Sequence, residues 1–254
     1  MENRSLMSHL YVNRISISKE IPQGNYLNDL SVVKNLKEMD GIHLSKKVTF
    51  LVGENGVGKS TLIEGIAVAM GFNPEGGTIN FNFSTKASHS DLYNYLTISR
   101  GYKKHKDGFF LRAESFYNVA TNIDEMDAEP VWTPTVISSY GGVSLHNKSH
   151  GESFMALVEN RFAGNGLYIL DEPEAALSPM RLMRLMYCMQ ELVNKNSQFI
   201  ISTHSPILMT FPEAEILEIT DDGITSVDYK ETEHFMITKR FMDAPEKMIE
   251  SLLG

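Results

Sequence analysis

Apolar residues along the chain follow two alternating patterns, short uninterrupted runs and repeats at helical spacing. The runs at Val48–Val52, 167–170 and Gln198–Ser202 predict strands buried on both faces, as in a parallel sheet. The helices that the spacing of three and four residues predicts cover 59–70, 153–162 and 181–193. This alternation predicts an α/β fold whose mostly parallel sheet is flanked by helices.

Weaker patterns predict the elements around this sheet. They are an early strand over 9–18 with an offset at Asn13–Arg14, a hairpin of strands 93–102 and 109–113 joined by the charged segment 103–108, a second hairpin of 216–219 and 224–229, and two short amphipathic helices over 232–253 broken by Pro245. The stretch 119–148 is rich in turn residues and predicts a loop-rich connection. We expect residues 1–254 to form a single domain.

Composition narrows the class of protein. The net charge of −9 argues against a surface coated with basic residues for nucleic acid, although it leaves open a local basic groove or a partner that binds DNA. A single cysteine, Cys188, excludes an intrachain disulfide and disfavours a cysteine-based metal site. Because no run of ~18 apolar residues and no secretory pattern is present, we expect a cytoplasmic protein with no membrane segment.

The segment 53–60 matches the phosphate-binding pattern G-x-x-x-x-G-K-[ST] at every position. It joins a predicted strand to a predicted helix, so its backbone N–H groups and the helix dipole can hold a phosphate chain. Lys59 can reach the β- and γ-phosphates, and the Ser60 hydroxyl can ligate Mg²⁺. The residues that we expect to bind nucleotide here are Gly53, Glu54, Asn55, Gly56, Val57, Gly58, Lys59, Ser60 and Thr61.

Polar side chains follow two of the buried runs. Asp171 and Glu172 end the run 167–170, and His204 follows Gln198–Ser202. The carboxyl ends of parallel strands meet at one edge of a sheet, where ligands bind in open α/β folds. We expect Asp171 to hold Mg²⁺, Glu172 to lie where water attacks, and His204 to sense the γ-phosphate.

Ser149 and Glu152 stand directly before the predicted helix 153–162. Their spacing alone is that of a capping box, in which each side chain bonds to the backbone N–H of the other residue. A phosphate-binding loop elsewhere in the chain leaves a second interpretation open, because the N-terminus of a helix capped in this way can also point at a phosphate.

Together these motifs resemble those of the ATP-binding cassette (ABC) ATPases, in the branch that includes RecF, the SMC heads and the OLD-like proteins. Segment 53–60 resembles Walker A, 167–172 Walker B with its adjoining acid, 176–179 the D-loop, His204 the switch histidine, and 149–152 the signature motif. The resemblance implies a standalone ABC head with an N-terminal antiparallel β part. A small helical lobe within about 72–160 would carry the signature motif.

Three departures from the family pattern stand out. His150 replaces the glycine of many members, and Glu152 replaces the glutamine that is usual in transporter subunits. No glutamine lies between Gln23 and Gln190, so the Q-loop glutamine, which helps to hold Mg²⁺ in the family, is missing. By its position after the predicted strand 109–113, Glu114 is the first candidate for the substitute metal ligand, and Asn118 is the second.

The resemblance implies a Mg²⁺-dependent ATPase that dimerises head to tail around two ATP molecules. The implied roles are catalysis by Lys59, Glu172 and His204, and Mg²⁺ binding by Ser60, Asp171 and Glu114. The signature residues Ser149, Gly151 and Glu152 would bind the nucleotide of the other subunit, with the γ-phosphate contact mainly from Ser149 and Gly151. The ATPase would switch a soluble effector, such as a nuclease, or DNA processing in repair or phage defence. The alternatives are a nucleotide-binding subunit of an ABC transporter and an ATP-bound scaffold with little turnover.

Overall fold

The structure of the chain is a computed structural model that describes residues 9–78, 90–113, 121 and 149–254. The proposed metal ligand Glu114 and the predicted loop-rich stretch 119–148 lie outside the described residues, apart from residue 121. Among the described residues, the helices are all too short or too polar to cross a bilayer.

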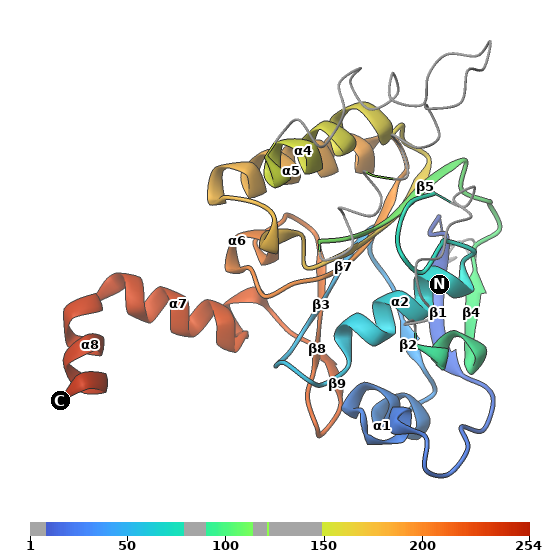
Figure 1. Cartoon of the computed structure of the whole chain (residues 1–254), viewed down its shortest axis with the longest axis horizontal. Helices are drawn as coiled ribbons and strands as arrows, with labels where there is room; N and C mark the ends of the chain where they lie inside the picture. The colour runs from blue at the N-terminus through green and yellow to red at the C-terminus, as the bar shows by residue number, and fades with distance from the viewer. Residues whose placement is uncertain (1–8, 79–89, 114–120, 122–148) are drawn as a thin grey trace, which may run out of the picture.

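The main sheet has six strands in the order β5-β6-β7-β3-β8-β9 (Figure 1). The strands are β3 Val48–Val52, β5 Asp107–Arg112, β6 Gly166–Asp171, β7 Gln198–Ser202, β8 Glu215–Ile219 and β9 Ile224–Ser226. All neighbours pair in parallel except β8 and β9, which form the antiparallel hairpin that the sequence predicts. The predicted mostly parallel sheet is therefore confirmed.

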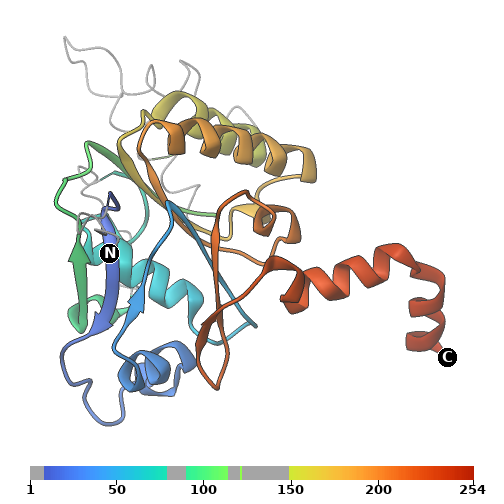
Figure 2. The ribbon, with the colours of Figure 1, turned by 180° about the vertical axis from the view of Figure 1, so that it is seen from behind.

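Both faces of this sheet are covered, because successive side chains of each buried strand enter different cores. In β3, Phe50 packs with α4 His150–Arg161, α5 Pro179–Asn194 and α6 Pro206–Met209, whereas Leu51 packs with α1 Ser31–Glu38 and α2 Lys59–Ala69. Figures 1 and 2 show these two helical layers on either side of the strands. The uninterrupted apolar runs in the sequence follow from this double burial.

A second, antiparallel sheet of order β2-β1-β4 lies beside α2. Its strands are β1 Val12–Ile17, β2 Ile42–His43 and β4 Leu96–Arg100, and the short helices η1 Tyr26–Asp29 and η2 Asp91–Asn94 precede α1 and β4. The register of β1 against β4 shifts between Val12 and Arg14, which confirms the predicted offset. The antiparallel β part implied by the resemblance is present.

The predicted hairpin of strands 93–102 and 109–113 is wrong. β4 pairs with β1 in the small sheet, while β5 pairs with β6 in the main sheet. Four consecutive residues of β5, 108–111, are buried, so this strand needs cover on both faces that the largely exposed β4 does not give. The charged segment carries the chain between the sheets, and its His105 ring stacks on Phe72.

Helix α5 has both buried and exposed side chains. Ser178 is its N-cap residue but makes no side-chain capping hydrogen bond, and Pro179 stands in the first turn. Of the α5 methionines, Met189 is buried and Met186 packs against the core. Met180 and Met183 are 71% and 49% exposed, so they do not belong to the core.

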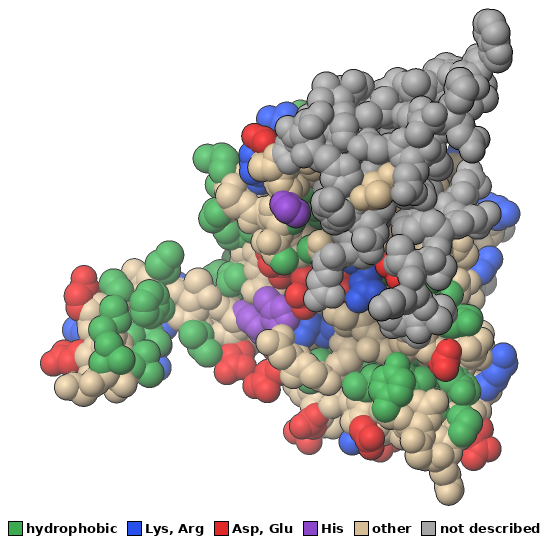
Figure 3. Space-filling model, in the orientation of Figure 1, with side chains coloured by type: hydrophobic (Ala, Val, Ile, Leu, Met, Phe, Trp, Pro, Cys, Tyr) green, Lys and Arg blue, Asp and Glu red, His purple; other side chains and the backbone are tan. Residues whose placement is uncertain are grey.

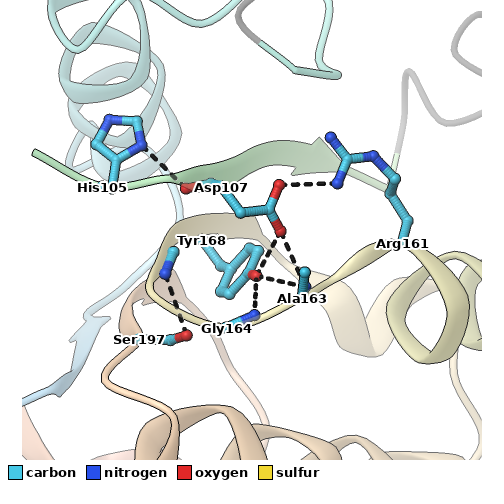
Figure 4. A network of polar contacts seen from close by, with 8 residues as sticks. His105, Asp107, Arg161, Ala163, Gly164, Tyr168 and Ser197 are labelled. Carbon is cyan, nitrogen blue, oxygen red and sulfur yellow. Dashed lines mark hydrogen bonds and ion pairs between the residues drawn. The ribbon is translucent and has the colours of Figure 1, made fainter.

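The end of β5 away from the candidate site is closed by a polar network around Asp107 (Figure 4). Its carboxylate accepts hydrogen bonds from the Tyr168 hydroxyl at 2.7 Å and the Ala163 N–H at 2.9 Å, and pairs with Arg161 at 2.8 Å. Burial alone would raise the pKa of Asp107, but these three partners outweigh burial and lower it. The network fixes the loop between α4 and β6.

The C-terminal segment leaves the body as an arm (Figure 1). It comprises α7 Glu233–Asp243 and α8 Pro245–Leu253, reached through the short helix η6 Tyr229–Glu231. The two predicted amphipathic helices and the break at Pro245 are confirmed. Neither helix has a buried residue, yet α7 begins beside the phosphate-binding loop.

Candidate functional site

The ends of four parallel strands form a single row at the carboxyl edge of the main sheet. Arg112 at the end of β5 pairs in register with Asp171 of β6, Asp171 pairs with Ser202 of β7, and Ser202 pairs with Leu51 of β3. The loop 53–58 begins two residues after Leu51 and leads directly into α2. The predicted acids and the phosphate-binding loop therefore meet at one edge.

At two positions where the loop passes close to other elements, its backbone has a conformation that only glycine adopts readily. Gly53 has a φ of 143°, and a Cβ there would lie 2.3 Å from the Ile219 carbonyl oxygen. Gly58 has a φ of 97° at the N-cap of α2, and its Cβ would lie 2.6 Å from a methyl group of the buried Val32. The glycines thus let the loop turn close to β8 and α1.

The remaining residues of the predicted nucleotide site surround this turn. Glu54, Asn55 and Gly56 are exposed at the mouth of the loop, Val57 is buried, and Ser60 and Thr61 are half-buried in the first turn of α2. The first-turn N–H groups of α2 at the loop are a ready-made site for an anion.

Lys59 is 4% exposed, although it carries a charge. Its Nζ donates hydrogen bonds to the carbonyl oxygens of Gly53 and Glu54, each at 2.8 Å, so the lysine closes the loop on itself. Burial lowers the pKa of Lys59, and the nearby carboxylates of Glu172 and Asp171 act in the opposite direction.

Asp171 is the centre of a buried polar cluster. Its Oδ1 accepts a hydrogen bond from the Ser202 hydroxyl at 2.5 Å, its Oδ2 lies 3.6 Å from Nε of Arg112, and the Ser60 hydroxyl also bonds to it. Arg112 in turn pairs with Glu64 of α2 at 2.6 Å. Burial raises the pKa of Asp171, while Ser202, Arg112 and Ser60 oppose the rise.

These residues fit Mg²⁺. The ion prefers oxygen ligands and is usually held by one or two carboxylates together with phosphate oxygens. The Ser60 hydroxyl and the Asp171 carboxylate already touch, so one ion can bind both. No three His, Cys, Asp or Glu side chains in the described parts of the chain gather into a metal site of their own. Phosphate oxygens would therefore complete the coordination.

Glu172 has a left-handed backbone, with φ 48° and ψ 55°, which is rare for a residue with a side chain. Its N–H donates to the Ser202 carbonyl at 3.1 Å and to the Ser202 hydroxyl at 3.2 Å, and these bonds hold the turn. The turn aims the half-exposed carboxylate at His204, whose Nε2 lies 3.4 Å from Oε1. Strained backbone of this kind is common at functional sites.

His204 contacts groups from two further elements. Its backbone N–H donates to the carboxylate of Glu174 in η5 Pro173–Ala175, and its Nδ1 lies 2.7 Å from Nε2 of His234 in α7. Burial, Lys59 and His234 together lower the pKa of His204 to about 4, so the imidazole is neutral at pH 7. Figure 3 shows histidine side chains gathered where the arm leaves the body.

An open pocket of about 440 Å³ lies between the loop and the arm. Its lining residues are Glu54, Asn55, His204, Glu233, His234, Ile237 and Thr238. The first turn of α7 is thus part of the wall beside the phosphate-binding loop.

The predicted signature segment lies apart from this row. Ser149 and Glu152 form the full capping box at the start of α4, and Glu152 also pairs with Arg181 at 3.2 Å. Gly151 leaves room for the turn before α5, because a Cβ there would lie 2.8 Å from the Ala176 carbonyl oxygen. α4 covers the face of the sheet opposite α2.

Comparisons with known proteins agree with this geometry. Residues 31–127 match the family model described as "AAA domain", and residues 154–210 match the model "AAA domain, putative AbiEii toxin, Type IV TA system". The structure is similar to cbiO1 from Clostridium perfringens, part of an ABC transporter complex, with a TM-score of 0.51 at 16% identity over 96% of this chain and 99% of that one. The chain has the phosphate-binding motif and the fold of the ABC/AAA P-loop ATPases.

Two curated relatives share parts of this sequence. The Vibrio cholerae protein "Retron Vc95 probable ATPase" is 31% identical over 136 residues, which cover 46% of this chain and 25% of the relative. The xylose import ATP-binding protein XylG of Moorella thermoacetica is 25% identical over 240 residues, which cover 89% of this chain and 45% of the relative. The chain thus spans less than half the length of either relative.

Sequence reasoning missed several residues of this P-loop site. Ser202, Arg112 and Glu64 surround Asp171, and Glu174 and His234 surround His204. Glu174 had a local signal, because it follows two residues after Glu172. Arg112 and His234 had none, since their positions depend on the partner strand of β5 and on the path of the C-terminal arm.

Proposed function

We propose that this chain is a Mg²⁺-dependent ATPase that closes head to tail on a second copy, and that the ATP-bound dimer switches an effector. The observation that supports it best is the row at the sheet edge, where Ser60, Asp171, Glu172 and His204 gather around one phosphate-binding loop. A glycine-rich turn that served only the fold would need its glycines but none of these four side chains.

The proposed roles follow from the contacts at the edge. Lys59 exchanges the carbonyl oxygens of Gly53 and Glu54 for phosphate oxygens and offsets the charge that develops on transfer. Ser60 and Asp171 hold Mg²⁺, which when bound supplies further positive charge to the phosphates. The exposed carboxylate of Glu172 accepts a proton from the attacking water, and its fixed turn keeps it in place.

The dimer completes the site from the other side. Ser149 caps α4, so the first-turn N–H groups of that helix offer a positive dipole end to a γ-phosphate held by the second copy. In a head-to-tail pair related by a two-fold axis, each chain contributes its phosphate-binding loop to one ATP site and the N-terminus of its α4 to the other. In this arrangement ATP is part of the interface, and hydrolysis opens it.

The relative from a retron supports an effector in phage defence, such as a nuclease, whereas the sugar-import relative supports a transporter partner. Purification of the tagged chain from its native host separates them. A soluble enzyme in constant ratio supports the first, and an integral membrane protein supports the second. An ATP-bound scaffold would show no turnover with any partner present.

Light scattering tests the dimer. Glu172→Gln keeps the shape of the side chain but removes the base, so with Mg·ATP we expect a stable dimer with turnover lowered about 100-fold or more. Lys59→Ala should remain monomeric, because it removes the charge that holds the phosphates. Glu38→Gln, the same change on the surface of α1, is the matched control and should behave as wild type.

The proposal fails if Glu172→Gln and wild type both remain monomeric with ATP at every accessible concentration and no partner restores the dimer. It also fails if Lys59→Ala dimerises as readily as Glu172→Gln, since the nucleotide would then not form the interface.

A further inference from the structure

His204 is joined to the C-terminal arm by a contact between two imidazole rings. The Nδ1 of His204 lies 2.7 Å from the Nε2 of His234, and the rings are 4.7 Å apart and tilted by 56°. Two ring nitrogens at this distance share one proton, so one ring donates and the other accepts.

The other nitrogen of His204 decides which ring donates. This Nε2 is buried and has no hydrogen-bond partner among the described residues, and it faces the Glu172 carboxylate at 3.4 Å. If Nδ1 carried the proton, Nε2 would present a lone pair to that carboxylate and to any phosphate bound nearby. Repulsion disfavours this tautomer, so Nδ1 accepts from His234 and Nε2 carries the proton.

We propose that His234 is a positioning residue that fixes the tautomer and orientation of His204, so that the Nε2–H of His204 is directed at the γ-phosphate. The inference rests on the proposed ATPase function. The charged groups around the pair are Lys59 of α2, Glu54 of the loop, Glu172 and Glu174 beside β6, and Glu233 of α7.

The position of His234 links the arm to the chemistry. It lies in the first turn of α7, a helix without a buried residue, and both His234 and Glu233 line the pocket beside the loop. Any displacement of α7 therefore breaks the bond to Nδ1 and frees His204 to change tautomer. The position of the arm thereby affects the histidine at the nucleotide site.

Kinetics of the full chain test this role. We expect His234→Ala to lower kcat about 10-fold with KM changed less than about 2-fold, because the phosphate loop is intact. His234→Gln should recover kcat to within about 3-fold of wild type, since its amide N–H₂ can occupy the place of Nε2 and donate to Nδ1. Arg240→Ala, an exposed residue of the same helix, is the control and should match wild type.

A second readout does not depend on turnover. In protein labelled with ¹⁵N-histidine, His204, identified by its loss in His204→Ala, should show a protonated Nε2 and a bare Nδ1, and His234→Ala should mix the two tautomers. The inference is overturned if His204 carries its proton on Nδ1 in the wild-type chain. It is also overturned if His234→Gln is as slow as His234→Ala. A wild-type chain without ATP turnover would refute the proposed function instead, and the spectrum would still decide the tautomer.

Discussion

Gln198 joins the two sheets, so its replacement tests how the fold is held together. The side chain is 1% exposed at the start of β7 and reaches the backbone of β1. Its Oε1 accepts from the Tyr11 N–H at 2.7 Å and the Val12 N–H at 2.9 Å, and its Nε2 donates to the Val12 carbonyl at 2.9 Å. The Gln198→Ala variant removes all three bonds while leaving the strand backbone unchanged.

The loss of stability in Gln198→Ala follows from the buried backbone groups that are left without a partner. A buried backbone group that loses its partner costs about 1–3 kcal/mol, and water entering the gap recovers part of this. For the two N–H groups and one carbonyl we expect the free energy of unfolding to fall by about 3–5 kcal/mol. That is a large share of the 5–15 kcal/mol typical of a domain.

Urea unfolding without nucleotide measures this change. Gln190→Ala on α5 is the matched control, because its side chain bonds only weakly to Asn194 at 3.3 Å, and it should lie within about 0.5 kcal/mol of wild type. A loss below about 1 kcal/mol in Gln198→Ala, with an unchanged denaturant slope, would refute the idea that Gln198 anchors the small sheet.

Two further changes test the Asp107 network and the phosphate-binding loop. Asp107→Asn should lower stability by about 1–2 kcal/mol at pH 7, because it loses charge-assisted bonds. Since folding lowers the pKa of Asp107, its contribution is present above the unfolded pKa of about 3.9 and is lost as pH falls through the folded pKa. Urea curves of the variant and wild type should therefore converge as pH falls through the folded pKa, and a constant gap would contradict the assignment. Gly58→Ala should weaken binding of a fluorescent ATP analogue more than 10-fold, since its Cβ meets Val32 at 2.6 Å, and unchanged binding would show that the loop does not need this turn.

Local signals explain most of what the sequence could predict about the fold. The buried runs, the phosphate-loop pattern, the capping box before α4 and the proline break in the tail each depend on neighbouring residues, and each is present in the structure. The prediction of a hairpin over 93–113 failed because the neighbour of a strand in a sheet depends on residues far away in the sequence. The pattern of 93–113 contains two strands but cannot show that β5 is buried on both faces beside β6.

The same distinction applies to the site. Asp171, Glu172 and His204 could be predicted because parallel strands bring their carboxyl ends together. Arg112 could not, since its meeting with Asp171 required the unpredicted pairing of β5 with β6. The role of Glu114 as a metal ligand stays a prediction, because that residue lies outside the described part of the chain.

The strands of the main sheet position Asp171 and Glu172, whereas the C-terminal arm contacts His204 at its Nδ1. A neutral imidazole can donate from only one nitrogen, so the direction of its proton is set by the partner of the other nitrogen. Here that partner is His234 of α7, a helix with no buried residue, so displacing the helix costs little free energy. A partner that draws the arm away would leave the acids and the phosphate loop in place but would remove the constraint on the histidine. We therefore expect such a partner to change the rate of hydrolysis and to leave nucleotide affinity nearly unchanged.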